Sequence, residues 1–154
     1  MHISAKSDYA MRAMLVLVDT SDKNNWVKAE VIADQQHLPR KFLEAILSDL
    51  RRARLVESLR GADGGYRLAK PATKIYVADV MRAVDGPLAE VRGLRPETLE
   101  YEGSAAGLQD VWIAVRAGLR AVLERVTVAD VAAGRLPESV QAMMQNEEAW
   151  VPRI

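Results

Sequence analysis

Two short runs of strand-forming residues, 55–60 and 66–70, enclose a glycine-rich segment, and this pattern constrains the fold more than any other feature. The enclosed residues 61–65 read Gly-Ala-Asp-Gly-Gly, which is typical of the tip of a β-hairpin. A phosphate-binding loop does not fit, because no helix is expected to begin at these glycines and no lysine stands at the P-loop offset. The pattern therefore predicts a small antiparallel hairpin that ends at Pro71.

Three helices are expected before the hairpin, over residues 4–19, 28–36 and 39–52. Ser4 is placed to cap the first helix, which is nearly all apolar from 11 to 18 and should be largely buried. A polar loop over 21–25 separates it from the second helix, whose expected inner face comprises Val31, Ile32 and Ala33.

The third helix is expected to begin at Pro39, since the first helical position does not need a backbone N–H. His37 precedes it at a turn that favours a positive φ, which histidine tolerates better than bulkier residues do. One apolar stripe with spacing i, i+3, i+4 and i+7 marks the face of the third helix that should be buried: Leu43, Ile46, Leu47 and Leu50.

Charge is unevenly distributed along a chain whose formal net charge is zero. Residues 1–75 contain 13 Lys or Arg and 9 Asp or Glu, whereas residues 76–154 contain 8 and 12. The stretch 40–74 alone has 9 basic and 4 acidic residues, so the basic charge gathers on the third helix and the hairpin. A turn, a basic helix and a basic hairpin in this order predict a winged helix-turn-helix DNA-binding domain over residues 1–85.

In this interpretation the third helix enters the major groove and the hairpin, or wing, contacts the DNA backbone or minor groove. Lys41, Glu44 and Ser48 share the face expected to read bases, while Arg60 at the wing can reach a minor groove or phosphate. Phosphate contacts position a protein without specifying sequence. The full predicted set is Lys6, Tyr9, Lys28, Arg40, Lys41, Glu44, Ser48, Arg51, Arg52, Arg60, Gly64 and Gly65, with Arg40, Arg51 and Arg52 assigned to phosphates.

The second half of the chain predicts a dimerisation element. A short helix over 77–84 and a long connection over 86–106 precede a helix expected at about 105–126. Its apolar residues are spaced 4, 3, 4, 3 and 4 apart, a heptad seam that favours pairing with a second copy, although a core helix of one monomer is the alternative. The seam residues are Leu108, Trp112, Val115, Leu119, Val122 and Val126.

Residues 86–134 are thus expected to form a sensor connection and dimerisation helix. Thr127 should cap a last short helix over 128–133, which Gly134 closes. A polar, loosely ordered tail is expected over 135–154. The fold class predicted overall is mainly α with a small β-hairpin wing, a winged helix-turn-helix plus a long dimerisation helix.

The chain contains no cysteine, which excludes disulfides, a thiolate zinc site and a cysteine nucleophile and is compatible with a cytoplasmic location. No apolar stretch reaches the roughly 20 residues of a membrane span. Enzymatic activity is not expected, because no histidine is paired with an acid beside a nucleophile elbow. A protein-interaction dimerisation module without DNA binding is the alternative function, and salt-dependent DNA binding separates the two.

Ordered motifs over about 130 residues resemble those of Rrf2-type bacterial regulators. They are Lys6-Ser7-Asp8-Tyr9-Ala10; Phe42-Leu43-Glu44 with Leu47 and Leu50; Arg60-Gly61 followed by Gly64-Gly65-Tyr66-Arg67-Leu68; Ile75, Val77 and Val80; Ala83-Val84-Asp85-Gly86; Trp112; and the run Val126 to Val131. The resemblance implies a homodimeric winged-helix repressor or activator, here expected to be a repressor, that binds double-stranded palindromic promoter DNA.

Many members of that family bind an iron–sulfur cluster through cysteines in the connection before the dimer helix. Residues 86–108 of this chain contain neither Cys nor His, and the first-helix positions used by a variant of the family correspond to Asp8 and Arg12. We therefore expect no cofactor and no metal, with His2 and His37 structural or solvated. The resemblance instead implies a small-molecule effector or a regulatory protein partner, with control of cysteine and sulfur metabolism as one such role. The expected effector site lies between the connection 86–106, the dimerisation helix and the first helix, with Tyr9 and Trp112 lining an apolar pocket there.

Overall fold

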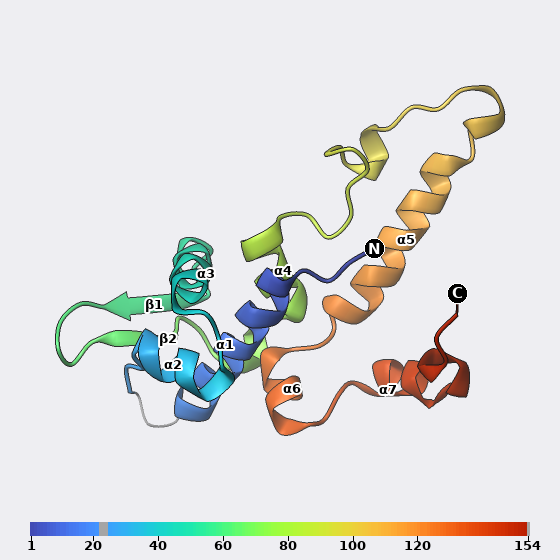
Figure 1. Ribbon diagram of the computed structural model, residues 1–154. Coiled ribbons are helices and arrows are strands. Elements are labelled where there is room, and N and C mark those ends of the chain that lie inside the picture. The colour runs from blue at the N-terminus through green and yellow to red at the C-terminus, as the bar shows by residue number, and fades with distance from the viewer. Residues whose placement is uncertain (22–24, 154) are drawn as a thin grey trace.

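The computed structural model describes residues 1–21 and 25–153, a mainly helical chain with a two-stranded hairpin, which confirms the predicted fold class (Figure 1). The expected polar loop over 21–25 lies largely outside these residues. The elements are α1 (Ala5–Ser21), α2 (Ala29–Gln36), α3 (Arg40–Arg52), β1 (Val56–Leu59), β2 (Gly65–Leu68), α4 (Val77–Asp85), α5 (Leu108–Leu123), α6 (Val128–Ala133) and α7 (Glu138–Gln145). Short 3₁₀ turns cover Ala72–Lys74, Pro96–Thr98, Gly103–Ala105 and Glu147–Trp150.

Helix α1 is the centre of the core. It contacts α2, α3, α4, α6 and β2, and Ala10, Ala13, Met14 and Leu17 on it are almost completely buried. The Ser4 hydroxyl accepts a hydrogen bond from the Ser7 backbone N–H, so the predicted cap is present. An apolar helix surrounded on several sides needs no polar face, and the continuous apolar run of α1 matches that position.

Helix α3 buries the apolar stripe that its spacing predicts. Leu43, Ile46, Leu47 and Leu50 are fully buried. The inner face of α2 is narrower than expected: Ile32 and Ala33 are buried, but Val31 is 42% exposed. The prediction for Val31 was wrong because three consecutive helical residues span too wide an arc to face one neighbour.

The turn between α2 and α3 depends on a left-handed residue, as the sequence predicts. His37 has φ 53° and ψ 46°, and the N–H of the buried Leu38 bonds to the carbonyl of Ala33. Pro39 is the cap residue with ψ 124° rather than the first helical residue, so α3 begins one position later than predicted. The Pro39 carbonyl accepts the bond from the Leu43 N–H and thereby starts the helix.

The hairpin is antiparallel, with Val56 opposite Leu68 and Leu59 opposite Gly65. Its second strand also pairs with the segment before α2: Val27 and Tyr66 exchange two backbone hydrogen bonds of 2.8 and 2.7 Å. One edge of β2 therefore pairs with β1 inside the hairpin, and the other edge attaches the hairpin to the segment before α2.

Helix α5 is shorter than expected. It covers 16 residues, because the Gly103–Ala105 turn delays its start and a turn at Glu124 ends it. Beyond that turn the Val126 carbonyl accepts a hydrogen bond from the Val77 N–H, which joins the chain to the start of α4. In Figure 1, α5 extends away from α1–α4, and the connection runs to its far end before turning back.

Among the C-terminal elements, α6 agrees with the prediction, whereas the tail after it is more ordered than predicted. Thr127 and Asp130 form a capping box on α6, and Gly134 ends it at φ 65°. The expected loosely ordered tail contains α7, in which Val140 is buried. Within residues 1–21 and 25–153, no helix combines the length and apolar character needed to cross a membrane.

Candidate nucleic-acid interface

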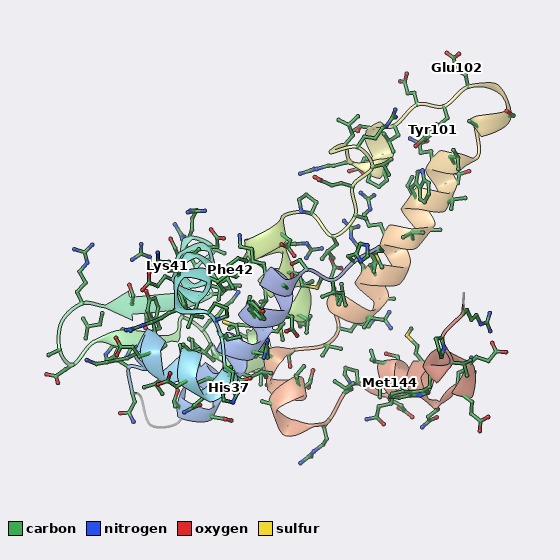
Figure 2. All side chains as sticks on the ribbon, viewed as in Figure 1. His37, Lys41, Phe42, Tyr101, Glu102 and Met144 are labelled. Atoms are coloured by element: carbon green, nitrogen blue, oxygen red, sulfur yellow. The ribbon has the colours of Figure 1, made fainter. Side chains whose placement is uncertain are left out.

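The exposed face of α3 is polar and lies opposite its buried stripe. Arg40, Lys41, Glu44 and Arg51 are exposed, and Ser48 is partly exposed. Figure 2 shows Lys41 on α3 with Phe42 beside it, while His37 lies on the preceding turn. A helix with one apolar side buried in its own domain can offer the other side to a groove without losing its support.

Several of the predicted phosphate contacts already have partners within the chain. Arg40 pairs with Glu30 of α2, and Arg52 lies 3.0 Å from a carboxylate oxygen of Asp49. Arg51 donates to the Ser58 hydroxyl at 3.3 Å. The side chains of Arg40 and Arg52 are more than half exposed, so these ion pairs are weak and can exchange for a phosphate at small cost.

Lys6 has a structural position that the sequence did not reveal. Its Nζ lies 2.6 Å from Asp49 of α3 and donates at 2.9 Å to the Val84 carbonyl near the end of α4. Its hydrogen bond to the Asp49 carboxylate holds the pKa of Asp49 below the ordinary value of 3.8. Lys6 therefore joins α1, α3 and α4, and its ammonium is engaged inside the domain.

The end of α4 is held to α1 by a second set of contacts. Asp85 accepts a hydrogen bond of 2.6 Å from the Ser7 hydroxyl and another from Ser4. Ser7 is buried, so this carboxylate satisfies a polar group inside the core. Together with Lys6, these contacts fix where α4 lies against the recognition-helix candidate α3.

The remaining predicted residues of α1 and α2 lie close to this face. The Tyr9 ring packs edge-on against Phe42 of α3, with centroids 5.8 Å apart, and the Arg12 guanidinium lies 4.9 Å from the Tyr9 ring centroid. Lys28 is exposed at the residue that precedes α2. Tyr9 thus supports the position of α3, whereas Lys28 is accessible to a ligand.

Glycines shape the wing by close approach. A side chain at Gly64 would place its Cβ 2.0 Å from the Leu59 carbonyl oxygen, and one at Gly65 would meet the Val27 carbonyl at 2.5 Å. Arg60 is exposed at the edge of this tip. Arg67 has a different position, since it pairs with Glu57 and stacks over Trp26 at 4.1 Å. Arg67 therefore stabilises the wing.

The predicted dimer seam lies mostly on α5, where no residue is buried. Leu108 and Val115 are 39% and 42% exposed, while Trp112, Leu119 and Val122 are partly exposed. Val126 is an exception: it follows the end of the helix and is 5% exposed inside its own chain. Its predicted place in the seam was wrong, because the short helix and the bond to Val77 turn it inward.

The structure does not bring together Tyr9 and Trp112, the two residues expected to line an effector pocket. Tyr9 packs on α3, and Trp112 donates from Nε1 to the Tyr101 hydroxyl at 3.1 Å, so the two rings belong to separate places. A pocket of about 490 Å³ does lie between α4, the connection and α5, and arginines line much of it. Sequence reasoning missed these arginines because 82, 95, 116 and 120 lie far apart along the chain.

Comparison with known proteins identifies the family. Residues 3–134 match the family described as Rrf2, iron-dependent transcriptional regulator. A relative from Mycobacterium tuberculosis, named as an HTH-type transcriptional regulator, is 48% identical over 97% of this chain and 92% of its own length. CymR of Bacillus subtilis is 34% identical over 86% of this chain and 90% of its own.

Solved structures agree with that assignment. The structure of CymR, titled the global cysteine regulator of B. subtilis, has a TM-score of 0.73 at 32% identity and covers 87% of this chain and 98% of that one. An IscR from T. potens has a TM-score of 0.67 at 29% identity, covering 100% of this chain and 94% of that one.

The donor set of this chain does not fit the iron that the family description names. The sequence has no cysteine to bind a cluster. In the described part of the chain, no group of three His, Cys, Asp or Glu side chains is placed to hold a metal ion. Asp8 pairs with Arg12 at 3.1 Å, so this carboxylate already has a cationic partner. The length and continuity of the match are independent of the metal, and the chain belongs to the Rrf2 family of winged-helix transcriptional regulators.

Proposed function

We propose that this regulator is a homodimeric, sequence-specific repressor in which α3 reads bases and the wing contacts the DNA backbone. The observation that carries the proposal is the division of α3 into a fully buried apolar stripe and an exposed polar face. This face lies in the same domain as a hairpin whose tip bears the exposed Arg60. The two elements have the chemistry of a reading helix and a backbone anchor.

Lys41 and Glu44 are the proposed base-reading pair. Both are exposed on α3. A lysine can donate to guanine O6 and N7, and a glutamate can accept from cytosine N4. Arg51 and Arg52, in the last turn of α3, are proposed to contact phosphates.

The dimer is proposed to form through α5. A 16-residue helix with no buried residue and with Leu108, Val111 and Val115 largely exposed is poorly covered by its own chain. A second copy would cover this face in the same way on both sides, as a two-fold interface requires. The operator is then expected to be a palindrome, with its half-sites separated by a whole number of helical turns.

Recovery of bound DNA across the genome would supply the operator. Because the CymR neighbour is titled a cysteine regulator, genes of cysteine metabolism are the first candidates for the proposed targets. Loss of the protein should raise transcription from the recovered promoters if it represses them. Lowered transcription from these promoters would instead identify an activator.

Fluorescence anisotropy with the operator and a scrambled duplex then tests the reading face. Glu44→Ala should lower discrimination by about 1–3 kcal/mol at one base pair, because an acceptor for one base is removed. Arg51→Ala should weaken binding to both duplexes alike and reduce the salt slope by about one. Arg60→Ala should cause the largest loss of affinity, since that side chain can serve both kinds of contact.

Glu138→Ala, an exposed carboxylate on α7, is the matched control and should leave both duplexes unchanged. If Glu44→Ala preserved the specificity ratio while Arg51→Ala abolished it, α3 would dock in another orientation. Absence of salt-dependent binding to any recovered DNA would favour a protein-interaction module instead.

A further inference from the structure

Four arginines from three separate parts of the chain converge on one pocket. Arg82 comes from α4, Arg95 from the connection, and Arg116 and Arg120 from α5. The pocket has a volume of about 490 Å³, within the range that small organic ligands occupy in proteins. Residues 86–89, which follow α4, complete its lining.

The carboxylates near this pocket only partly balance the arginines. Arg116 pairs with Glu97, while Arg82 and Arg120 both pair with Glu124. Arg95 forms no ion pair with any residue in the described ranges 1–21 and 25–153. Four cations and two carboxylates leave two positive charges in excess, and like charges held this close repel each other unless an anion joins them.

Arg116 is the most firmly held of these arginines. Only 16% of the Arg116 side chain is exposed, and Glu97 fixes it from the Pro96–Thr98 turn. Arg116 and Arg120 are one helical turn apart and therefore point to the same side of α5. Guanidinium groups bind carboxylate, phosphate and sulfate groups through paired hydrogen bonds, which favours an anion over a neutral molecule.

The pocket side of α5 differs from its exposed apolar side. Successive helical residues are offset by about 100°, so Arg116 does not share the direction of Val115, but it lies one turn from Trp112 and Leu119 of the predicted seam. Leu108, Val111 and Val115 mark the apolar side. A second copy on the apolar side would therefore pack next to Arg116 and border the pocket, while Arg120 lies further round the helix.

We propose that this pocket binds a small organic molecule bearing at least two carboxylate, phosphate or sulfate groups. One anionic group bonds Arg95, the arginine that forms no ion pair, and a second group bonds Arg116 or Arg120. This extends the proposed function, on which any effect upon DNA rests, whereas the binding of the anion itself does not depend on it.

The pocket has a contact route to α3. Arg82 lies on α4, whose C-terminal end holds Lys6 through the Val84 carbonyl, and Lys6 pairs with Asp49 of α3. An anion that draws Arg82 away from Glu124 would release one link between α4 and the end of α5. The expected consequence is a change in the affinity of the dimer for its operator.

Isothermal titration calorimetry of the full chain with citrate and with pyrophosphate, each of which carries more than one anionic group, tests the site. Ionic strength is held constant with sodium chloride, so that general charge screening cannot imitate binding. We expect saturable binding of at least one probe at one site per protomer. Arg95→Ala should weaken it about tenfold or more, because a charge-assisted hydrogen bond is lost.

Arg135→Ala, an exposed arginine outside the pocket, is the control and should bind the probe like the original chain. Arg95→Ala should retain its melting temperature, since this exposed side chain has no ion pair to lose. The probe that binds more tightly tells whether the natural ligand is of the carboxylate or the phosphate type. Absence of saturable binding by both probes, or equal affinity in Arg95→Ala, would overturn the proposal.

Operator binding measured with and without the bound probe completes the experiment. An affinity change of several-fold that disappears in Arg95→Ala would support the contact route. Failure to bind DNA both with and without the probe would refute the proposed function while leaving the pocket supported by calorimetry. Probe binding with unchanged operator affinity would overturn the contact route alone.

Discussion

Helices α3 and α5 are both amphipathic, yet their apolar faces have opposite surroundings. In α3 the residues Leu43, Ile46, Leu47 and Leu50 are completely buried by the same chain. In α5 no residue is buried, and Val111 is half exposed. Apolar periodicity therefore shows that a face will be covered, but it does not show which chain covers it.

The neighbours of the two helices explain this difference. Helix α3 packs against α1, α2, α4 and β1. Helix α5 has its main contacts with the Pro96–Thr98 turn and α4, which lie to one side of it. The stability of α3 should therefore be a property of the single chain, whereas the face of α5 should respond to protein concentration.

The largest effect is expected at Leu119, which is half-buried on α5. It tests whether a second copy covers the apolar face of α5. Leu119→Asp should destabilise the proposed dimer by about 3–5 kcal/mol per protomer, because an unpaired charge would enter the proposed seam. Light scattering should then report a monomer at micromolar concentration.

Ala117→Asp is the matched control, because residue 117 is two positions away and points to the opposite side of the helix. It should remain dimeric. If Leu119→Asp also stayed a folded, DNA-binding dimer, the seam would be misplaced.

The second-largest effect is expected when a buried side chain of α3 is shortened. Leu47→Ala should lower the free energy of unfolding by about 2–5 kcal/mol, since it removes a fully buried side chain and leaves a cavity. Urea denaturation should give the same loss at every protein concentration.

Val111→Ala on α5 is the comparison variant for that measurement. The loss of unfolding free energy caused by Val111→Ala should shrink as the protein is diluted, because the atoms that Val111 contacts are expected to belong to the other copy. A loss at Val111 that is independent of concentration would mean that α5 is covered by its own chain.

The smallest expected effect concerns the ion pair that holds α3 to α1. Lys6 depresses the pKa of Asp49, so the folded chain binds the proton less readily than the unfolded chain. The resulting stability is present above the unfolded pKa near 3.8 and is lost as the pH falls through the lower folded value. Asp49→Asn should cost about 1 kcal/mol at pH 7.

Thermal unfolding of both proteins between pH 2.5 and 7 measures this contribution. The two melting temperatures should begin to converge as the pH falls below the unfolded value near 3.8, and they should meet once the pH is below the lower pKa of the folded chain. A gap between the two proteins that is constant over the whole range would assign the role of Asp49 to packing instead.

Local chemistry explains how much could be predicted. The stripe of α3, the glycine tip of the wing, the left-handed turn at His37 and the Thr127 capping box depend on residues close together in the sequence. Each carries its own conformational preference, so short segments were sufficient to place them.

The misplaced features depend on distant contacts. The end of α5 is set partly by the bond between Val126 and Val77, which no pattern within residues 105–126 contains. Lys6 stays a predicted DNA contact, but its 2.6 Å ion pair with Asp49 joins two helices and could not be read from a local pattern. The arginine pocket has the same origin, since three elements must meet before its charge becomes visible.

The pair of backbone hydrogen bonds between Val27 and Tyr66 has a consequence for the thermodynamics of DNA binding. These bonds fasten the wing to the residues that lead into α2, and α2 packs directly on α3. The proposed reading helix and backbone anchor are thereby preorganised relative to each other before DNA arrives. Little conformational entropy is then lost in bringing them into register, so more of the contact energy remains as affinity.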